Sequence, residues 1–532
     1  MEIDINDMGS IGAIADMPPY MLPPEAWTQA VNMRSQDGGL VRPLGWTTVF
    51  GTPTVAPHFL MPVMTTAVAY WIYVSLTKAY VYDGSSHTNI TRQTASVDVN
   101  YTATNGYDWN GTNLGGIPIL NNGADIPQFW SPIGVGTKLA NLTNWTATSR
   151  AKVIRAFGPF LVAFNLTDAG TSRPHLIRWS HPADPGSVPA SWDTADETKD
   201  TGDTELSDVN SGVIHDALPL GSIMYIYKEN AVHKMRFVGG RKIMDFGDAA
   251  WLPTIGILAP RCVGVTGDGR KHVFASRDDL LWHDGNQVRS ILNRRQKRRL
   301  AADMDSQAFP SSFIFANPNF NEMLFCYPGT GLSFPDRGFI IQYGDGDDFC
   351  ITDIDGITFR HAAAGPIENP ATELWSDNPS ELWSDETGPW ASQDRYRVVL
   401  AGTADTLLFK LDEGTTRNGV GFISTLQREG LAIMGRNRRT GEWIVDHHTM
   451  KLFQRLWPKL QGSAVSIRIG VQQTVKGAVT WSDVTTFDPA TDVTADILPM
   501  QGRAVSLEIK WAAGSSGRID GYKMELEPVA EF

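Results

Sequence analysis

Three aspartates, Asp345, Asp347 and Asp348, stand within the sequence GDGDD and could bind calcium through their carboxylate oxygens. An EF-hand loop places further ligands at fixed intervals and a glutamate at its twelfth position. Counted from Asp345, the twelfth position here is Gly356. The spacing therefore favours a hairpin turn over a calcium site.

The adjacent pair His447 and His448 is a second candidate for metal binding. Successive residues of a strand point to opposite faces, so such a pair does not converge on one ion. The sequence also lacks the Gly-x-Ser-x-Gly, His-Glu-x-x-His and phosphate-binding Gly-Lys-Ser/Thr motifs. Carboxylates are plentiful, but nothing in their spacing pairs two across a cleft as in a glycosidase. We therefore expect no catalytic residue, no metal, no cofactor and no enzymatic activity.

A run of basic residues lies within the one segment that predicts a helix, Arg289 to Asp305. Its five basic residues are Arg294, Arg295, Lys297, Arg298 and Arg299. They could contact nucleic acid or an acidic partner. They could also form a solvated helix face or match the acidic loops of the protein itself, and charge runs usually face solvent.

Six tryptophans stand in segments rich in turn residues and could stack on sugars: Trp109, Trp130, Trp192, Trp375, Trp383 and Trp390. Filling the spaces between blades or between subunits is the favoured interpretation. The long polar loop 181–212 and the segment 373–390, which repeats ELWSD, are therefore expected at subunit or partner contacts. Trp192, Trp375, Trp383 and Trp390 are the candidate interface residues.

The composition describes a folded acidic protein of 532 residues, with 42% hydrophobic residues and a formal net charge of −13. A protein that grips DNA phosphates is usually basic, whereas an acidic chain can surround DNA without holding it. The three cysteines do not have metal-site spacing and suit reduced core residues of a chain made in a reducing cytoplasm. No secretory signal pattern opens the sequence, and no run of about 18 apolar residues predicts a membrane span.

Short strands separated by turn residues run through most of the chain, which predicts an all-β fold. One pattern recurs weakly, at Tyr80 to Asn89, Leu281 to Ile291 and Leu407 to Gly414, and it predicts the blades of a β-propeller. We expect residues 1–54 to be extended and to pair with distant strands. Residues 55–420 then form the propeller with long inserted loops, and residues 421–532 a C-terminal β-sandwich-like module.

A string of motifs spread along the chain resembles the tail hub or nozzle proteins of short-tailed bacteriophages, also called tail tubular protein B or phage stabilisation proteins. In chain order the motifs are Asn32-Met-Arg, Gly38-Gly-Leu-Val-Arg-Pro-Leu-Gly-Trp46, Pro127-Gln-Phe-Trp130, Arg178-Trp-Ser-His-Pro-Ala-Asp-Pro185, Ser191-Trp-Asp193, Tyr225-Ile-Tyr-Lys-Glu-Asn230, Met235-Arg-Phe-Val-Gly-Gly240, Ala259-Pro-Arg-Cys262, His283-Asp-Gly285, Arg455-Leu-Trp-Pro-Lys459 and Gly502-Arg-Ala-Val-Ser506.

This resemblance implies a six-bladed propeller with additional platform modules. It also implies a hexameric ring in the virion tail, made in the cytoplasm of the host bacterium. Such a ring closes the tail, docks adaptor and fibre or needle proteins, and lets double-stranded DNA pass without tight binding. The alternative is a receptor- or glycan-binding tail propeller, which could also cleave glycans if it holds a paired acid and base in a cleft.

Overall fold

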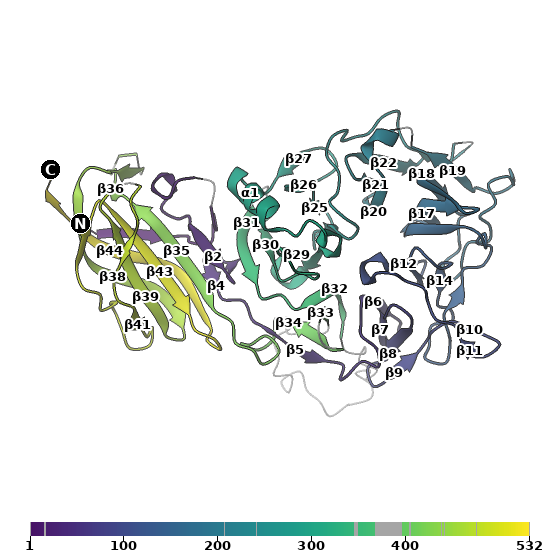
Figure 1. Ribbon diagram of the computed structural model, residues 1–532, viewed down its shortest axis with the longest axis horizontal. Coiled ribbons are helices and arrows are strands. Elements are labelled where there is room, and N and C mark those ends of the chain that lie inside the picture. The colour runs from purple at the N-terminus through teal and green to yellow at the C-terminus, as the bar shows by residue number, and fades with distance from the viewer. Residues whose placement is uncertain are drawn as a thin grey trace, which may run out of the picture.

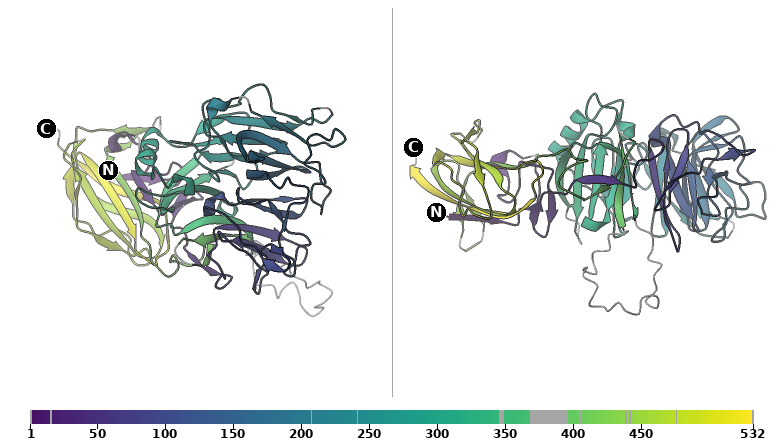
Figure 2. Two further views of the ribbon diagram at one scale, coloured as in Figure 1. Left: turned by 45° about the vertical axis from the view of Figure 1, so that its right-hand side comes forward. Right: turned by 90° about the horizontal axis from the view of Figure 1, so that it is seen from below.

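The computed structural model describes residues 2–14, 17–206, 208–240, 242–344, 349–367, 396–403, 406–437, 439–440, 442–474 and 476–530. Strands account for 49% of the structure, and α1 (Arg294–Asp303) is the single α-helix among the described residues. The all-β prediction is thus confirmed. A β-propeller and a β-sandwich lie side by side, with the sandwich beyond the rim of the propeller (Figures 1 and 2).

Seven blades of four antiparallel strands form the propeller. The first three blades are β6 (Phe59–Met64), β7 (Ala69–Val74), β8 (Ala79–Tyr82) and β9 (His87–Asn89); β12 (Asn110–Leu114), β13 (Ile117–Asn121), β14 (Gln128–Phe129) and β15 (Ala140–Asn141); and β16 (Arg150–Phe157), β17 (Phe160–Asp168), β18 (Thr171–Trp179) and β19 (Gly202–Glu205). A small hairpin, β10 (Gln93–Thr94) and β11 (Val97–Asp98), stands between the first two blades.

The remaining blades continue in chain order. They are β20 (Ile214–Leu220), β21 (Ile223–Lys228), β22 (Val232–Phe237) and β23 (Met244–Asp245); β24 (Val263–Val265), β25 (His272–Ala275), β26 (Leu280–His283) and β27 (Val288–Ser290); β28 (Phe313–Asn317), β29 (Glu322–Tyr327), β30 (Arg337–Tyr343) and β31 (Phe349–Asp355); and β32 (Phe359–Pro366), β33 (Tyr396–Gly402), β34 (Leu408–Leu411) and β5 (Trp46–Val49). From β12 onward, the first strand of each blade lies beside the first strand of the next blade, and β32 of the seventh blade lies beside β6 of the first.

The seventh blade closes the ring with a strand from the opposite end of the chain. β5 pairs antiparallel with β34, so that Trp46 stands opposite Leu411. The expectation of six blades is therefore wrong. Six of the seven blades are independent four-stranded sheets. The other blade, β28 to β31, forms the first four strands of a ten-stranded sheet that continues into the sandwich.

The weak sequence repeat corresponds to equivalent strands of three blades. Its copies fall on β8–β9 of blade one, β26–β27 of blade five and β34 of blade seven. In the first two, an aspartate (Asp83 or Asp284) accepts hydrogen bonds from backbone N–H groups two and three residues on. The next residue, Gly84 or Gly285, has a φ of 93° or 94°, which a glycine adopts without strain.

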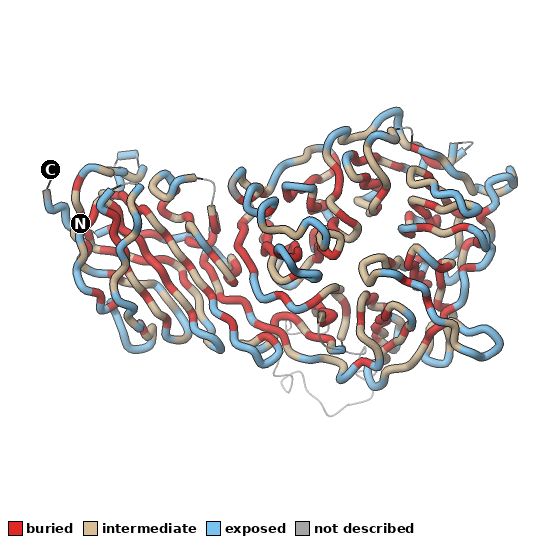
Figure 3. The backbone as a smooth tube through the Cα atoms, viewed as in Figure 1, coloured by how far each residue is buried: buried red, intermediate tan, exposed pale blue. Residues whose placement is uncertain are grey.

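Both faces of a blade are covered by its neighbours, which explains strands that are apolar along most of their length. In β17, FLVAFNLTD, the first five residues are all buried. Apolar clusters form between neighbouring blades, and Figure 3 shows the buried backbone running through the blades and the sandwich. By contrast, β1 (Glu2–Asn6, EIDIN) alternates exposed and buried residues because only one of its faces meets the sandwich core.

Two sheets pack face to face in the sandwich. One contains β1, β3 (Arg34–Gln36), β4 (Gly39–Val41), β44 (Gly517–Ala530), β38 (Met450–Gly462) and β42 (Met500–Gly502). The other contains β2 (Gln29–Val31), β35 (Ser424–Leu431), β43 (Ala504–Trp511), β39 (Val465–Gln472), β40 (Thr480–Trp481) and β41 (Thr485–Phe487). A separate hairpin joins β36 (Ile433–Arg436) to β37 (Trp443–Val445).

The N-terminal segment is distributed over both parts of the molecule. β1 and β4 pair with β44, β2 lies between β31 and β35, and β5 completes blade seven. Through β2, blade six and the second sandwich sheet form one continuous ten-stranded sheet.

Candidate functional site at the junction of propeller and sandwich

The junction between the two parts contains a dense group of buried polar contacts, and Asn32 lies at its centre. Asn32 directly follows β2 and has a φ of 54°, a left-handed conformation that asparagine tolerates better than most residues. Its side chain donates hydrogen bonds to Asp355 Oδ1 and to the backbone oxygen of Ile423 at 2.5 and 2.8 Å, and accepts one from Arg417 Nη2 at 2.8 Å. One residue thus joins blade six, the entry to β35 and the N-terminal segment.

Two residues further on, Arg34 leads from β3 into a fully buried ionic cluster. Its guanidinium donates to both carboxylate oxygens of Glu322 at 2.8 and 2.7 Å, and to Asp412 Oδ1 at 2.7 Å. Asn317 Nδ2 donates to the same two carboxylates at 2.9 and 2.7 Å. Burial opposes the charge of Arg34, but the attraction of Glu322 and Asp412 outweighs it and raises the arginine pKa. The cluster ties the sandwich to blades six and seven.

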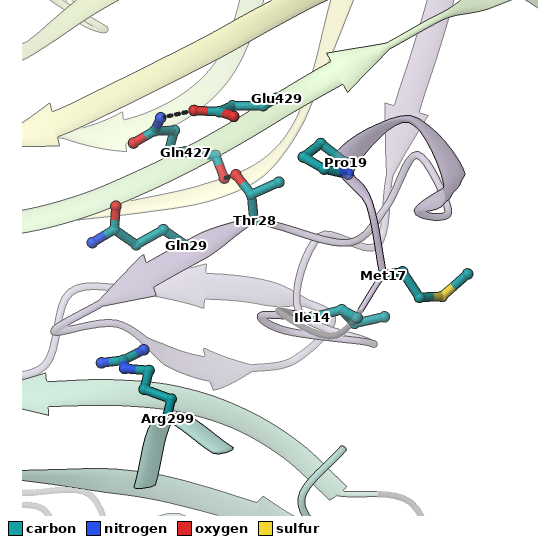
Figure 4. Close-up of a pocket in the computed structure, with 8 residues that line it drawn as sticks. All are labelled: Ile14, Met17, Pro19, Thr28, Gln29, Arg299, Gln427 and Glu429. Carbon is teal, nitrogen blue, oxygen red and sulfur yellow. Dashed lines mark hydrogen bonds between the residues drawn. The ribbon is translucent and has the colours of Figure 1, made fainter. Parts of the chain in front are cut away.

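A cavity of about 410 Å³ opens beside this junction, between α1 and β35. Its lining residues are Ile14, Met17, Pro19, Thr28, Gln29, Arg299, Gln427 and Glu429 (Figure 4). Gln427 Nε2 donates to Glu429 Oε1 at 2.6 Å on one wall, and Arg299 lies on the opposite wall. Arg299 Nη1 forms a 2.7 Å ion pair with Asp353, and burial raises the pKa of Asp353 in spite of that pair. The polar walls of the cavity are therefore largely paired with each other or with the protein.

The basic helix α1 begins later than the sequence predicts. Arg289 belongs to β27, and Asn293 caps the helix by accepting a hydrogen bond from the Gln296 N–H at 2.9 Å, while Gln296 Oε1 accepts from the Asn293 N–H. Gln296 and Leu300 are buried, and Gln296 Nε2 donates to the backbone oxygen of Ala13 at 3.2 Å. The helix thereby packs on the N-terminal segment, at the outer rim of the propeller (Figure 1).

The five candidate basic residues do not act as one surface. Lys297 pairs with Asp279 at 2.6 Å, and Arg299 pairs with Asp353, so these two match acidic residues of the protein itself. Arg294 and Arg298 are exposed and form no ion pair with an acidic residue in the described part of the chain. The side chain of Arg295 lies outside what the structure describes.

Of the six candidate tryptophans, the three that the structure describes lie in the interior. Trp192 is 4% exposed and meets Trp145 edge to face at a centroid distance of 4.7 Å, within the cluster between blades two and three. The ring of Trp192 is thus covered by its own chain, and its role as an interface anchor stays a prediction. Trp109 and Trp130 are buried as well. Trp375, Trp383 and Trp390 lie outside the described residues, as do Asp345, Asp347 and Asp348.

A second buried polar group joins blades four and five. His272 Nε2 lies 3.2 Å from the backbone oxygen of Pro219, so it donates there and leaves Nδ1 to accept from Tyr227 Oη at 2.7 Å. The tyrosine oxygen then accepts from His283 Nε2 at 2.7 Å. Burial lowers the pKa of His272 to about 4 and, with the nearby His272 and Lys234, that of His283 to about 3. The three side chains are fully buried and form a neutral hydrogen-bonded chain that holds two blades together.

Sequence reasoning missed the ionic cluster at the junction. Arg34 belongs to a motif that carries the family resemblance, but its partners lie far along the chain, Glu322 at the start of β29 and Asp412 directly after β34. A signal existed in β29, EMLFCY, where a glutamate opens a strand that is otherwise apolar and wholly buried. A buried carboxylate requires a cation or several donors, so Glu322 could have been singled out as half of a pair.

Within the described ranges, no group of three or more His, Cys, Asp or Glu residues could hold a metal ion. No helix found there is long and apolar enough to span a membrane.

No protein-family model matches the sequence, and no curated protein matches it. Among solved structures, the chain is similar to a 6-phosphogluconolactonase-like protein of Bacteroides uniformis, with 10% identity over 72% of this chain and 96% of that one, at a TM-score of 0.38. It is also similar to the WD40 domain of Toxoplasma gondii coronin, with 8% identity over 69% and 83% at a TM-score of 0.37. A third is YCF48 bound to D1 peptide, with 10% identity over 76% and 98% at a TM-score of 0.34. The β-propeller class of this chain is assigned from the order of the strands in its own sheets.

Proposed function

We propose that this chain is a structural subunit of the ring-shaped tail nozzle of a short-tailed bacteriophage. The observation that supports the proposal is the junction: the stretch from Asn32 to Trp46, which carries part of the family resemblance, also builds the connection between propeller and sandwich. A ring around a DNA conduit needs subunits whose contact surfaces are held at fixed separations. The shared sheet and the buried ionic cluster would supply that stiffness.

In this proposal the ring has six copies, lies in the virion tail and closes it until the genome leaves. It docks an adaptor on one side and fibre or needle proteins on the other, and it needs neither a cofactor nor catalysis. Six copies would carry a formal charge of six times −13, or −78, before counterions. A negative wall repels the phosphates of passing DNA, which favours a conduit that does not hold its cargo.

The experiment is a mass measurement by light scattering together with negative-stain electron microscopy of the purified protein. A closed ring of six copies of the 58.4 kDa chain, about 350 kDa, is expected. The variant Arg34→Ala tests the role of the junction. Its rings should form less completely than those of the wild type, because the link between propeller and sandwich is weakened. A chain that stays monomeric at every concentration and binds or cleaves host glycans would instead favour the receptor-binding alternative.

A further inference from the structure

The starts of the innermost propeller strands bring together a group of basic residues that no role described above uses. We call this group, His58, Arg261, Arg360 and His361, the axial cluster. His58 directly precedes β6 of blade one, Arg261 precedes β24 of blade five, and Arg360 and His361 belong to β32 of blade seven. All four are partly exposed, although their chain positions are as much as 303 residues apart.

Arg261 is the unusual member of the axial cluster. Its guanidinium atoms Nε and Nη1 are shielded from solvent and have no hydrogen-bond partner, and no ion pair joins it to an acidic residue in the described ranges. Its backbone is held in the left-handed region, with a φ of 65°. A cation that is shielded from water and lacks a counter-ion is costly, as is a left-handed arginine, and such features concentrate at functional sites.

The acidic residues nearest to Arg261 are engaged elsewhere. Asp216 Oδ1 accepts from Arg155 Nη2 at 2.6 Å and from the backbone of Ala217 at 2.8 Å, and its Oδ2 accepts only from the backbone N–H of Arg261, at 3.2 Å. Asp108 Oδ2 accepts from the backbone and side chain of Asn105, both at 3.2 Å. Neither carboxylate therefore satisfies the guanidinium of Arg261.

The other members of the cluster lie near this site. Arg360 is already engaged in part, because its Nε and Nη2 donate to the backbone oxygens of Gly402 and Thr403. Arg360 Nη1 lies 3.1 Å from His58 Nδ1. Burial, followed by the charges of Arg360 and Arg261, lowers the pKa of His58 to about 4.

The ring of Phe313 lies near both Arg261 and His361, with its centroid 5.8 Å from Arg261 Cζ and 6.3 Å from the centre of the His361 ring. His361 Nδ1 accepts from the backbone N–H of Leu60 at 3.2 Å, which leaves its Nε2–H as a donor.

We propose that the axial cluster binds an oxyanion group, a phosphate or a carboxylate, with the guanidinium of Arg261 as its principal partner and Arg360 and His361 beside it. Guanidinium groups recognise both groups through paired charge-assisted hydrogen bonds. A bound oxyanion would supply the direct charge-assisted hydrogen bonds that neither Asp108 nor Asp216 makes to the Arg261 guanidinium. The phenyl ring of Phe313, whose centroid lies 5.8 Å from Arg261 Cζ, borders the site.

The test measures thermal unfolding and calorimetric binding of the full chain in a buffer free of oxyanions, with added inorganic phosphate, added acetate, or chloride at equal ionic strength. The variants are Arg261→Gln and, as a matched control, Arg298→Gln on the exposed face of α1. Phosphate or acetate should raise the Tm of the wild type and of Arg298→Gln by about 2–4 °C near saturation. In Arg261→Gln the affinity should fall at least about tenfold.

The same variant provides a second measurement that does not depend on the ligand. Because Arg261→Gln removes an uncompensated charge, its Tm without oxyanion should equal or exceed that of the wild type. The acetate and phosphate arms tell a carboxylate ligand from a phosphate ligand. Equal stabilisation of all three proteins, or no stabilisation by either anion beyond that of chloride, would overturn the proposal, as would a lower Tm of Arg261→Gln without oxyanion.

Discussion

Arg34 and Glu322 stand 288 residues apart in the sequence, yet the guanidinium of one holds both carboxylate oxygens of the other in a site closed to solvent. Arg34 belongs to the N-terminal segment and Glu322 opens the second strand of blade six. Arg34 also donates a hydrogen bond to Asp412, which follows the third strand of blade seven. The attachment of sandwich to propeller is therefore polar and geometrically specific, because each charge requires the others.

Replacing Arg34 with alanine should destabilise the protein by about 3–5 kcal/mol, because Glu322 and Asp412 would remain buried without a cation. Urea unfolding followed by circular dichroism measures this change. The matched control is Arg173→Ala, which removes the half-exposed pair with Glu205 and should cost less than about 1 kcal/mol. Equal effects of the two substitutions would show that the junction cluster does not stabilise the fold.

Replacing Trp192 with alanine should cost about 3–5 kcal/mol of stability, because the ring fills the space between blades two and three against Trp145. Thermal unfolding is the measurement. Leu498→Ala is a suitable control, since that side chain is 79% exposed and its loss should change little. If Trp192→Ala weakens ring assembly and leaves Tm unchanged, the residue acts at an interface after all.

Acid should destabilise the protein through the buried chain of Tyr227, His272 and His283. Both histidines have folded-state pKa values below the ordinary 6.5, so the unfolded state binds more protons than the folded state below that pH. Their contribution to the free energy of unfolding is complete above about pH 6.5 and is lost as the pH falls to about 4 for His272 and about 3 for His283. Between pH 6.5 and those values, each histidine lowers the free energy of unfolding by about 1.4 kcal/mol per pH unit.

The pH effect is measured as the difference between the wild type and His272→Gln in urea midpoints from pH 7.5 to 4.5. The variant should be less stable at neutral pH and should show a shallower loss on acidification. Parallel profiles for the two proteins would mean that His272 does not titrate on unfolding in this range.

DNA should bind weakly to the assembled protein, with little dependence on salt, if the net charge governs its passage. Arg294→Gln combined with Arg298→Gln removes two exposed charges of α1 and should leave the affinity for duplex DNA unchanged, because α1 lies at the propeller rim. Fluorescence anisotropy at several salt concentrations measures this. Tight binding that falls steeply with salt and is lost in the double variant would make α1 a DNA contact.

Local patterns in the sequence predicted short strands separated by turn residues and the all-β class, because alternation and turn chemistry are set by neighbouring residues. The blade count was not predictable in this way. Blade seven takes β5 from the N-terminus, and the strands of blade six also belong to the sandwich sheet. Such pairings depend on contacts between residues hundreds of positions apart.

The candidate residues also divide into those determined by neighbouring residues and those determined by distant contacts. The start of α1 depended on a local capping box between Asn293 and Gln296, which the run of basic residues obscured. The burial of Trp192, the partners of Arg34 and the unpaired guanidinium of Arg261 depend on which blades become neighbours. A sequence shows that a charged or aromatic residue is present, but the closed ring decides whether that residue meets solvent, a counter-ion or another ring.

The pairing of β1 with β44 has a consequence for biosynthesis. Ile3 of β1 stands opposite Met524 of β44, so this pairing cannot form until a further 521 residues have been synthesised. At about 5–20 residues per second, that takes roughly half a minute to two minutes. During that time the apolar faces of the N-terminal strands lack their partners. Nascent chains of this protein should therefore depend on chaperones more than proteins whose domains complete themselves in chain order.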